Sequence, residues 1–106
     1  MEQERSFDQL CLVARQGDAH AQFLLGLMYA EGCSVKKDDT VVAAWYRKAA
    51  EQGHAHAQYN LGLMYAAGRG VEMDEDEAVS WYRKAADQGH AGALSRIMTC
   101  MKRAGL

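Results

Sequence analysis

Four histidines are the side chains of this sequence whose type and spacing could support chemistry, and His54 and His56 are separated by a single residue. Neutral imidazole is a frequent ligand of zinc and other transition metals, so such a pair can mark the edge of a metal site. A helix brings two ligands to one ion when they are four residues apart, and no two of these histidines have that spacing. If His54 and His56 lie on one helix, their side chains point about 200° apart and cannot share an ion.

A repeat of 36 residues explains where the histidines fall. Two successive segments of that length are identical at 21 of 36 positions, and a third copy begins after them. His20 and His56 occupy one position of the repeat, whereas Asp18, His54 and His90 occupy another, where a side chain can cap a helix. The sequence therefore predicts histidines distributed by the repeat rather than gathered at a site, and we expect no metal and no cofactor.

The rest of the sequence argues against catalysis and against several classes of partner. It contains no nucleophile–base–acid set and no phosphate-binding loop, so we expect no enzyme; a small metalloprotein or enzyme that uses the histidines is the rival hypothesis. A net charge of −2 gives no basic surface for nucleic acid, and no apolar run reaches membrane-spanning length. The start of the chain lacks the features of a signal peptide. Three cysteines (Cys11, Cys33 and Cys100) form no CxxC motif, which predicts reduced thiols and a cytoplasmic location.

Each copy of the repeat contains two predicted helices joined by short loops. Apolar residues recur at helical spacing over 18–31 and again over 54–67, and a glycine follows each stretch. A second helix begins in each copy at an aspartate that can cap it, and half copies at both ends bring the prediction to six antiparallel helices. Gly26 and Gly62 lie inside helices, where glycine costs about 1 kcal/mol relative to alanine. We therefore expect the paired helix to approach closely at both positions.

The repeat also matches a known pattern of residues. The second copy contains 57-AQYNLGLMYAAG-68, 70-GVEMD-74 and 78-AVSWYRKAA-86, with a close copy one repeat earlier. These spacings resemble the Sel-one-like repeat, a relative of the tetratricopeptide repeat, over nearly the whole chain; Ser34 and Val42 in the first copy are mild departures. The resemblance implies an all-α, right-handed α/α solenoid of helix-turn-helix repeats with a concave inner face. It also implies non-catalytic work through protein–protein contacts, as an adaptor, scaffold or regulator.

We accordingly expect one solenoid domain over residues 1–106. In the last half repeat Met98 replaces the helix glycine, which fits a capping unit that no second helix follows, and we expect a natural boundary at Leu106. The predicted parts are a half repeat at 6–16, full repeats at 17–52 and 53–88, and a capping half repeat at 89–106.

A second stripe on the first helix of each repeat is the predicted binding surface. By the geometry of the family that the chain resembles, this stripe lines the concave groove. Its apolar members predict a groove for an apolar or amphipathic segment of a protein or peptide partner. By the same resemblance, Asn60 and Arg96 fall where some peptide-binding tetratricopeptide domains hold a carboxylate. The predicted groove residues are His20, Phe23, Leu24, Leu27, Glu31, His56, Tyr59, Asn60, Leu63, Ser95, Arg96 and Thr99.

Alternatives stay open for this surface. Phe23 and Tyr59 are equally compatible with packing against the next repeat, and Trp45 and Trp81, which share one repeat position, are predicted to be core residues. The chain could instead be an inhibitor or immunity-type protein that blocks one specific target. It could also be a structural unit that associates weakly with itself to bury the ends of a short stack.

Overall fold

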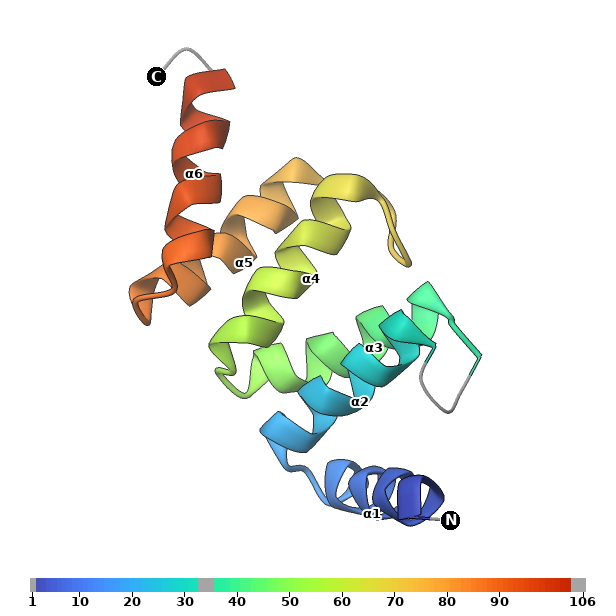
Figure 1. Cartoon of the computed structure of the whole chain (residues 1–106). Helices are drawn as coiled ribbons and strands as arrows, with labels where there is room; N and C mark the ends of the chain where they lie inside the picture. Colours follow the sequence, from blue (N-terminus) through green and yellow to red (C-terminus); the bar gives the residue numbers. More distant parts are fainter. Residues whose placement is uncertain (1, 33–35, 104–106) are drawn as a thin grey trace.

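Six helices that follow one another in a stack make up the described part of the chain (Figure 1). The computed structural model describes the backbone of residues 2–32 and 36–103 and the side chains of residues 7–32 and 36–98. No β-strand occurs among these residues, so the predicted all-α class and the six helices are confirmed. The helices are α1 (Glu2–Arg15), α2 (Ala19–Glu31), α3 (Asp39–Glu51), α4 (Ala55–Ala67), α5 (Glu75–Asp87) and α6 (Ala91–Arg103).

Side-chain caps explain where the helices begin. Asp18 Oδ1 accepts a hydrogen bond from the Ala21 N–H at 2.8 Å at the start of α2, and the aspartates that precede α3 and α5 act in the same way. The cap of α4 is His54, whose Nδ1 accepts from the Ala57 N–H at 3.2 Å. Left-handed glycines, with φ of 73° and 68°, end α2 and α4. The predicted caps and the predicted glycine ends are therefore confirmed.

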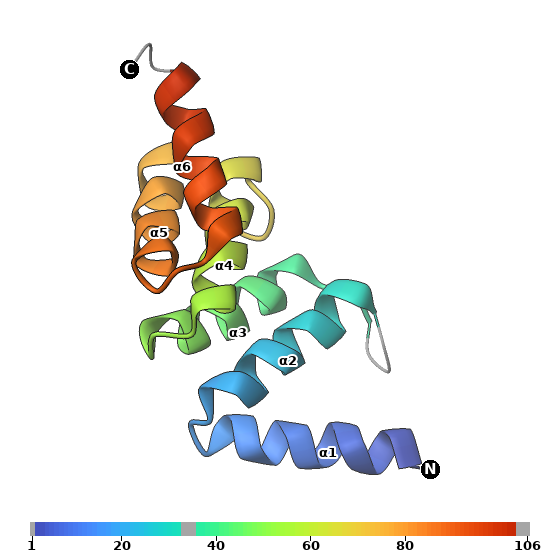
Figure 2. The ribbon, with the colours of Figure 1, turned by 60° about the vertical axis from the view of Figure 1, so that its left-hand side comes forward.

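The helices pack on their neighbours in chain order. All of the extensive helix–helix contacts join consecutive helices, and Figure 2 shows α1 and α6 at opposite ends of the stack. The stack is elongated, with extents of 53 × 25 × 17 Å and a radius of gyration of 14.5 Å, against about 13 Å for a compact chain of this size. Sequential contact of this kind is typical of repeat proteins. None of the six described helices is long and apolar enough to cross a membrane.

A tyrosine of the second helix lies over a glycine of the first helix in each full repeat. A Cβ atom added to Gly26 would lie 2.7 Å from the ring of Tyr46, and one added to Gly62 would lie 2.6 Å from the ring of Tyr82. Both tyrosines are buried. The close approach predicted from the two glycines is confirmed, and its cause is an aromatic ring that needs the space of a missing side chain.

The buried core continues from one repeat into the next. Its largest cluster joins α2, α3, α4 and α5 around Phe23, Tyr46, Leu61 and Trp81. Smaller clusters join α1 to α2 and α4 to α5 and α6. Trp81 is only 6% exposed, which confirms its predicted place in the core, whereas Trp45 in the first repeat is half-buried and packs beside α1.

Buried glutamines tie consecutive repeats together, a feature that the sequence reasoning missed. Gln22 donates from Nε2 to the Ala14 carbonyl at 3.0 Å and accepts from the Gln52 side chain at 2.8 Å. Gln22 is buried, and its contacts satisfy polar groups that would otherwise lack partners away from water. One repeat later, matching bonds of 3.1 and 3.0 Å join Ala50, Gln58 and Gln88.

Candidate functional site: a histidine row along the stack

The four histidines form a single row along the stack. In the order His20, His54, His56 and His90, neighbouring ring centroids are 5.4, 6.1 and 5.0 Å apart. His20 Nδ1 lies 3.2 Å from His54 Nε2, and His56 Nδ1 lies 3.2 Å from His90 Nε2. The repeat does distribute the histidines, but the prediction that they are not gathered is wrong. The stacking of the repeats places the start of α2 beside the cap of α4, and the start of α4 beside the cap of α6.

His54 joins the row because it caps α4 rather than belonging to it. Its backbone is extended, with φ of −71° and ψ of 110°. The separation of about 200° expected between His54 and His56 assumes that both residues are helical, so it does not apply. The ring of His54 can therefore lie between His20 and His56 and stack on Phe23, at a centroid distance of 4.6 Å.

The caps determine which ring nitrogens carry protons. Because the Ala57 N–H donates to His54 Nδ1, that nitrogen holds no proton, and in the neutral ring the proton is on Nε2. His54 Nε2–H then donates to His20 Nδ1, which leaves the His20 proton on Nε2. The exposed histidine of the pair consequently presents an N–H donor at the surface. The same chain of bonds runs through Ala93, His90 and His56.

The surroundings of both capping histidines favour the neutral ring. Burial lowers the pKa of His54, and the neighbouring rings of His20 and His56 lower it further, against an opposite influence of Asp18. Burial also lowers the pKa of His90, and His56 adds to that effect. Neutral rings are what the hydrogen-bond chain requires, so geometry and electrostatics agree.

The same bonds make the row a poor metal site. A metal ion needs an unprotonated nitrogen from each histidine, but in His54 and His90 that nitrogen already accepts the helix-capping bond. Among the described residues, no group of three or more histidine, cysteine or acidic side chains could hold an ion. What the row offers instead is hydrogen bonding through the exposed rings of His20 and His56.

The apolar members of the predicted groove belong largely to the packing between repeats. Phe23 is only 9% exposed, and its ring stacks on His54 and Tyr46, which favours the packing alternative for this residue. Tyr59 is half-buried and stacks on His90, with ring centroids 4.5 Å apart. The remaining apolar members are half-buried against the same clusters; they are Leu24, Leu27 and Leu63.

The polar members lie further along the same face. Asn60 is half-buried and hydrogen-bonds to the Tyr46 hydroxyl of the preceding repeat, where burial raises the pKa of the tyrosine. Glu31 of α2 is exposed, as are Ser95 and Arg96 of α6. The side chain of Thr99 lies outside the described residues. The predicted groove residues exposed at the surface are therefore His20, Glu31, His56, Ser95 and Arg96.

An open apolar hollow lies beside His20, between α1 and α2. Its volume is about 320 Å³. Half of its apolar wall comes from α1, which the groove prediction left out because it considered only the first helix of each repeat, whereas α1 corresponds to a second helix. Since His20 belongs to both the hollow and the histidine row, the two features form one continuous surface. The lining residues are Gln9, Leu10, Val13, Asp18, His20, Ala21 and Leu24.

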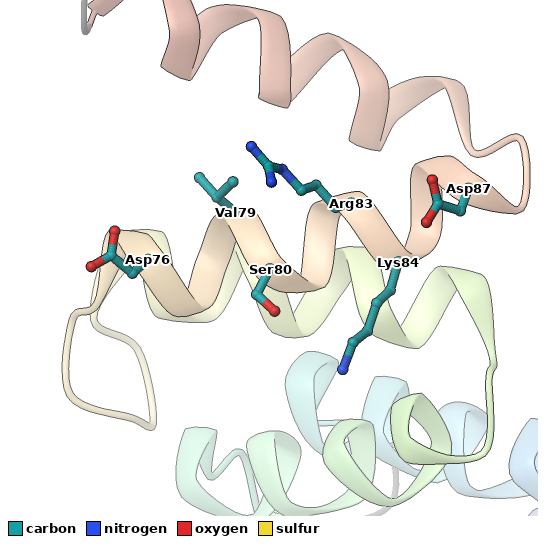
Figure 3. A pocket seen from close by; sticks show the side chains of 6 residues that line it. All are labelled: Asp76, Val79, Ser80, Arg83, Lys84 and Asp87. Carbon is teal, nitrogen blue, oxygen red and sulfur yellow. The ribbon is translucent and has the colours of Figure 1, made fainter.

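A second hollow, of about 490 Å³, lies along α5 and is lined by charged and small side chains (Figure 3). In Figure 3, Arg83 extends on the side of α5 toward α6, whereas Lys84 extends on the opposite side. The Lys84 ammonium lies 4.3 Å from the ring centroid of Trp81, so this side chain covers the core tryptophan. Two carboxylates and two cationic groups line this hollow, so its charge favours no class of ligand. The lining residues are Asp76, Val79, Ser80, Arg83, Lys84 and Asp87.

Comparison with known families identifies the repeat. The model of the Sel1 repeat matches residues 19–54 and 55–90, which together form more than half of the chain. The chain belongs to the Sel1 repeat family. Each matched Sel1 repeat contains both members of one histidine pair, with His20 and His54 in the first and His56 and His90 in the second. The spacing of the matched repeats is the predicted one, and their starting points lie two residues later than those we expected.

Solved Sel1 structures share the fold. A Sel1 repeat protein from Oxalobacter formigenes is 44% identical, with a TM-score of 0.84 over 91% of this chain and 40% of that one. The protein c5321, described as a protective antigen of uropathogenic Escherichia coli with an SLR fold, is 42% identical, with a TM-score of 0.85 over 93% of this chain and 21% of that one. Cysteine-rich protein B of Helicobacter pylori is 29% identical, with a TM-score of 0.83 over 87% and 69%. No curated protein matches the chain. The chain spans less than half of the length of the first two of these Sel1 proteins.

Proposed function

We propose that this Sel1 repeat chain is a non-catalytic binding module that holds a peptide or protein segment on the face shared by α2, α4 and α6. The observation that carries the proposal is the continuity of that face. An apolar hollow next to α1 opens beside His20, and the histidine row leads from it toward α6. Membership of a family that typically mediates protein interactions supports the same conclusion.

The chemistry of the face indicates what the segment contains. An apolar side chain fits the hollow, where Val13 and Leu24 form part of the wall. Carbonyl or carboxylate groups can accept hydrogen bonds from the Nε2–H groups of His20 and His56. Arg96, exposed at the far end on α6, suits an acidic group. The proposed ligand is therefore an extended segment with an apolar residue followed by acidic residues, in an adaptor or regulatory role.

A pair of substitutions on one helix tests this proposal. Val13 lines the hollow, whereas its neighbour Leu12 is 59% exposed and does not. We expect peptides from an immobilised library that bind the wild type to bind Val13→Glu at least about tenfold more weakly, which corresponds to about 1.4 kcal/mol. Leu12→Glu is the matched control and is expected to bind within about twofold. Circular dichroism checks that both variants fold. Equal binding to all three proteins, or a library without any ligand, would contradict the proposal.

Exposed apolar side chains at the two ends of the stack favour self-association as a second candidate function. Leu12 on α1 and Leu94 and Met98 on α6 are 59%, 54% and 59% exposed. Single scattered apolar residues are common on surfaces, but two neighbouring turns of α6 share this exposure. Light scattering over a concentration series, with Met98→Glu as the comparison, distinguishes the two functions. If the wild type and Met98→Glu both keep the monomer mass at every concentration, self-association is excluded.

The inhibitor alternative differs from the adaptor in stoichiometry. One tight partner bound one-to-one favours a blocking protein, and several weak partners favour an adaptor. A cytoplasmic location and the absence of catalysis stay predictions that fractionation and activity screening can test.

A further inference from the structure

A proton added to either histidine pair finds no place in the existing hydrogen-bond chain. On His54 Nδ1 it would face the Ala57 N–H, so the cap of α4 would be lost. On His20 Nδ1 it would face the Nε2–H of His54, so the contact between the two rings would be lost. The same conflict arises one repeat later at Ala93, His90 and His56.

We infer that the two histidine pairs are proton-sensitive clasps, closed when the capping rings of His54 and His90 are neutral and opened when mild acidification protonates those two rings, and that they regulate the binding face. This inference rests on the proposed function only where it concerns a bound ligand. Each closed clasp joins the first turn of one first helix to the cap of the next, through a 3.2 Å contact. Opening therefore loosens two successive junctions of the stack and places positive charge beside the binding face.

The groups around each clasp set the pH at which it opens. His54 faces His20 and Asp18 from the side of α2 and His56 from its own helix. Burial and the two histidines lower its pKa, while the Asp18 carboxylate raises it. The net effect is a lowered pKa, so His54 is protonated only below the ordinary histidine pKa of about 6.5.

The second clasp has fewer charged neighbours. His90 faces His56 and the ring of Tyr59, both from α4. Burial lowers the pKa of His90, and His56 lowers it further. Both clasps are therefore expected to open in the same direction on acidification.

Amide hydrogen exchange tests the clasps with a control inside the same molecule. The Ala57 and Ala93 amides are capped by histidine, whereas the Ala21 amide occupies the same repeat position and is capped by Asp18. All three alanines are buried. From about pH 7.5 to about pH 5.5, we expect protection factors at Ala57 and Ala93 to fall roughly fivefold, as loss of a typical cap predicts, while Ala21 keeps its protection. Unchanged protection at Ala57 and Ala93, or an equal fall at Ala21, would overturn the inference.

A double variant separates proton binding from capping. Asparagine caps helices as well as aspartate does and does not titrate, so His54→Asn with His90→Asn is expected to keep the caps and lose the acid response at Ala57 and Ala93. An acid response as large as that of the wild type would overturn the inference. Nitrogen-15 shifts of the wild-type imidazoles at pH 7.5 are a second check, because a proton on Nδ1 of His54 or His90 contradicts the bonding described.

Binding measurements then connect the clasps to the face. A library peptide that binds the wild type is expected to change its affinity by at least about tenfold between pH 7.5 and pH 5.5. In the double variant, which keeps only His20 and His56, we expect a clearly smaller change. Equal changes in both proteins would overturn the regulatory part of the inference. The amide measurement needs no ligand, so it can fail or succeed independently of the proposed function.

Discussion

Replacing Gly62 with alanine tests the closest contact within a repeat. The new Cβ would lie 2.6 and 2.7 Å from two atoms of the Tyr82 ring and 3.1 Å from the Ala78 carbonyl oxygen. The ring is buried and the carbonyl belongs to the backbone of α5, so neither can move freely. Overpacking of this kind costs about 1–3 kcal/mol, and the helix preference of alanine over glycine offsets about 1 kcal/mol. Taking the upper end of the overpacking range, we expect Gly62→Ala to lower the free energy of unfolding by about 2 kcal/mol.

The same substitution at two further glycines, Gly26 and Gly92, is expected to cost less stability than at Gly62. At Gly26 the new Cβ would meet the Tyr46 ring at 2.7 Å, but the next atom, of Trp45, lies 3.5 Å away, so we expect a smaller loss of about 1 kcal/mol. At Gly92 in α6 the nearest atoms lie 3.1 to 3.4 Å away, at the ends of the His90 and Tyr59 side chains. Gly92→Ala is therefore the control, expected to change stability by less than about 1 kcal/mol in either direction.

Urea unfolding followed by circular dichroism measures these differences. A double-mutant cycle with Tyr82→Leu identifies the cause, because the cost of Gly62→Ala is expected to shrink when the ring is absent. Two results would refute the reasoning. One is a Gly62→Ala protein as stable as the wild type, and the other is an undiminished cost in the Tyr82→Leu background.

The remaining predictions concern the core, the glutamine contacts and the histidines. Trp81→Ala is expected to cost about 3–5 kcal/mol in urea unfolding, since the side chain is buried, and a loss below about 1 kcal/mol would contradict its place in the core. Gln58→Leu leaves the Ala50 carbonyl without its side-chain donor and is expected to cost about 1–3 kcal/mol; a neutral effect would show that water replaces the bond. The pKa values of His54 and His90 are lowered in the folded state, so the unfolded chain binds protons first on acidification. Their contribution to stability is therefore complete above about pH 6.5 and declines as the pH falls toward the folded-state pKa values, and a urea midpoint that is flat from pH 7.5 to pH 5.5 would refute this.

The fold was predictable because the same helix-forming and helix-ending residues occur in both copies of the repeat. Helical spacing, capping aspartates and terminal glycines recur in both copies, and each copy checks the reading of the other. The glycines at 26 and 62 even indicated a close contact, although the sequence alone does not say that a tyrosine ring makes it. The sequence pattern does not, however, predict how one repeat packs against the next.

The predicted groove shows the consequence of that gap. A helical wheel places Phe23 beside His20 on one stripe, but stacking turns Phe23 beneath the cap of the next helix and leaves His20 outside. The polar contacts between repeats were missed for the same reason. Gln22 and Gln52 are 30 residues apart and meet only because the repeats stack. Their recurrence at Gln58 and Gln88 was the available signal.

The choice of cap shows how the histidine row depends on stacking. Asp18, His54 and His90 perform the same capping task, so capping alone does not explain why histidine replaces aspartate twice. His54 and His90 each follow a histidine 34 residues earlier, and the two rings meet at 3.2 Å in both pairs. Gly92 stands where a third surface histidine would extend the row. Both histidine caps therefore lie where a ring of the preceding stretch can accept a hydrogen bond from them, which is the pattern expected if the contact between rings, and not capping alone, determines the residue.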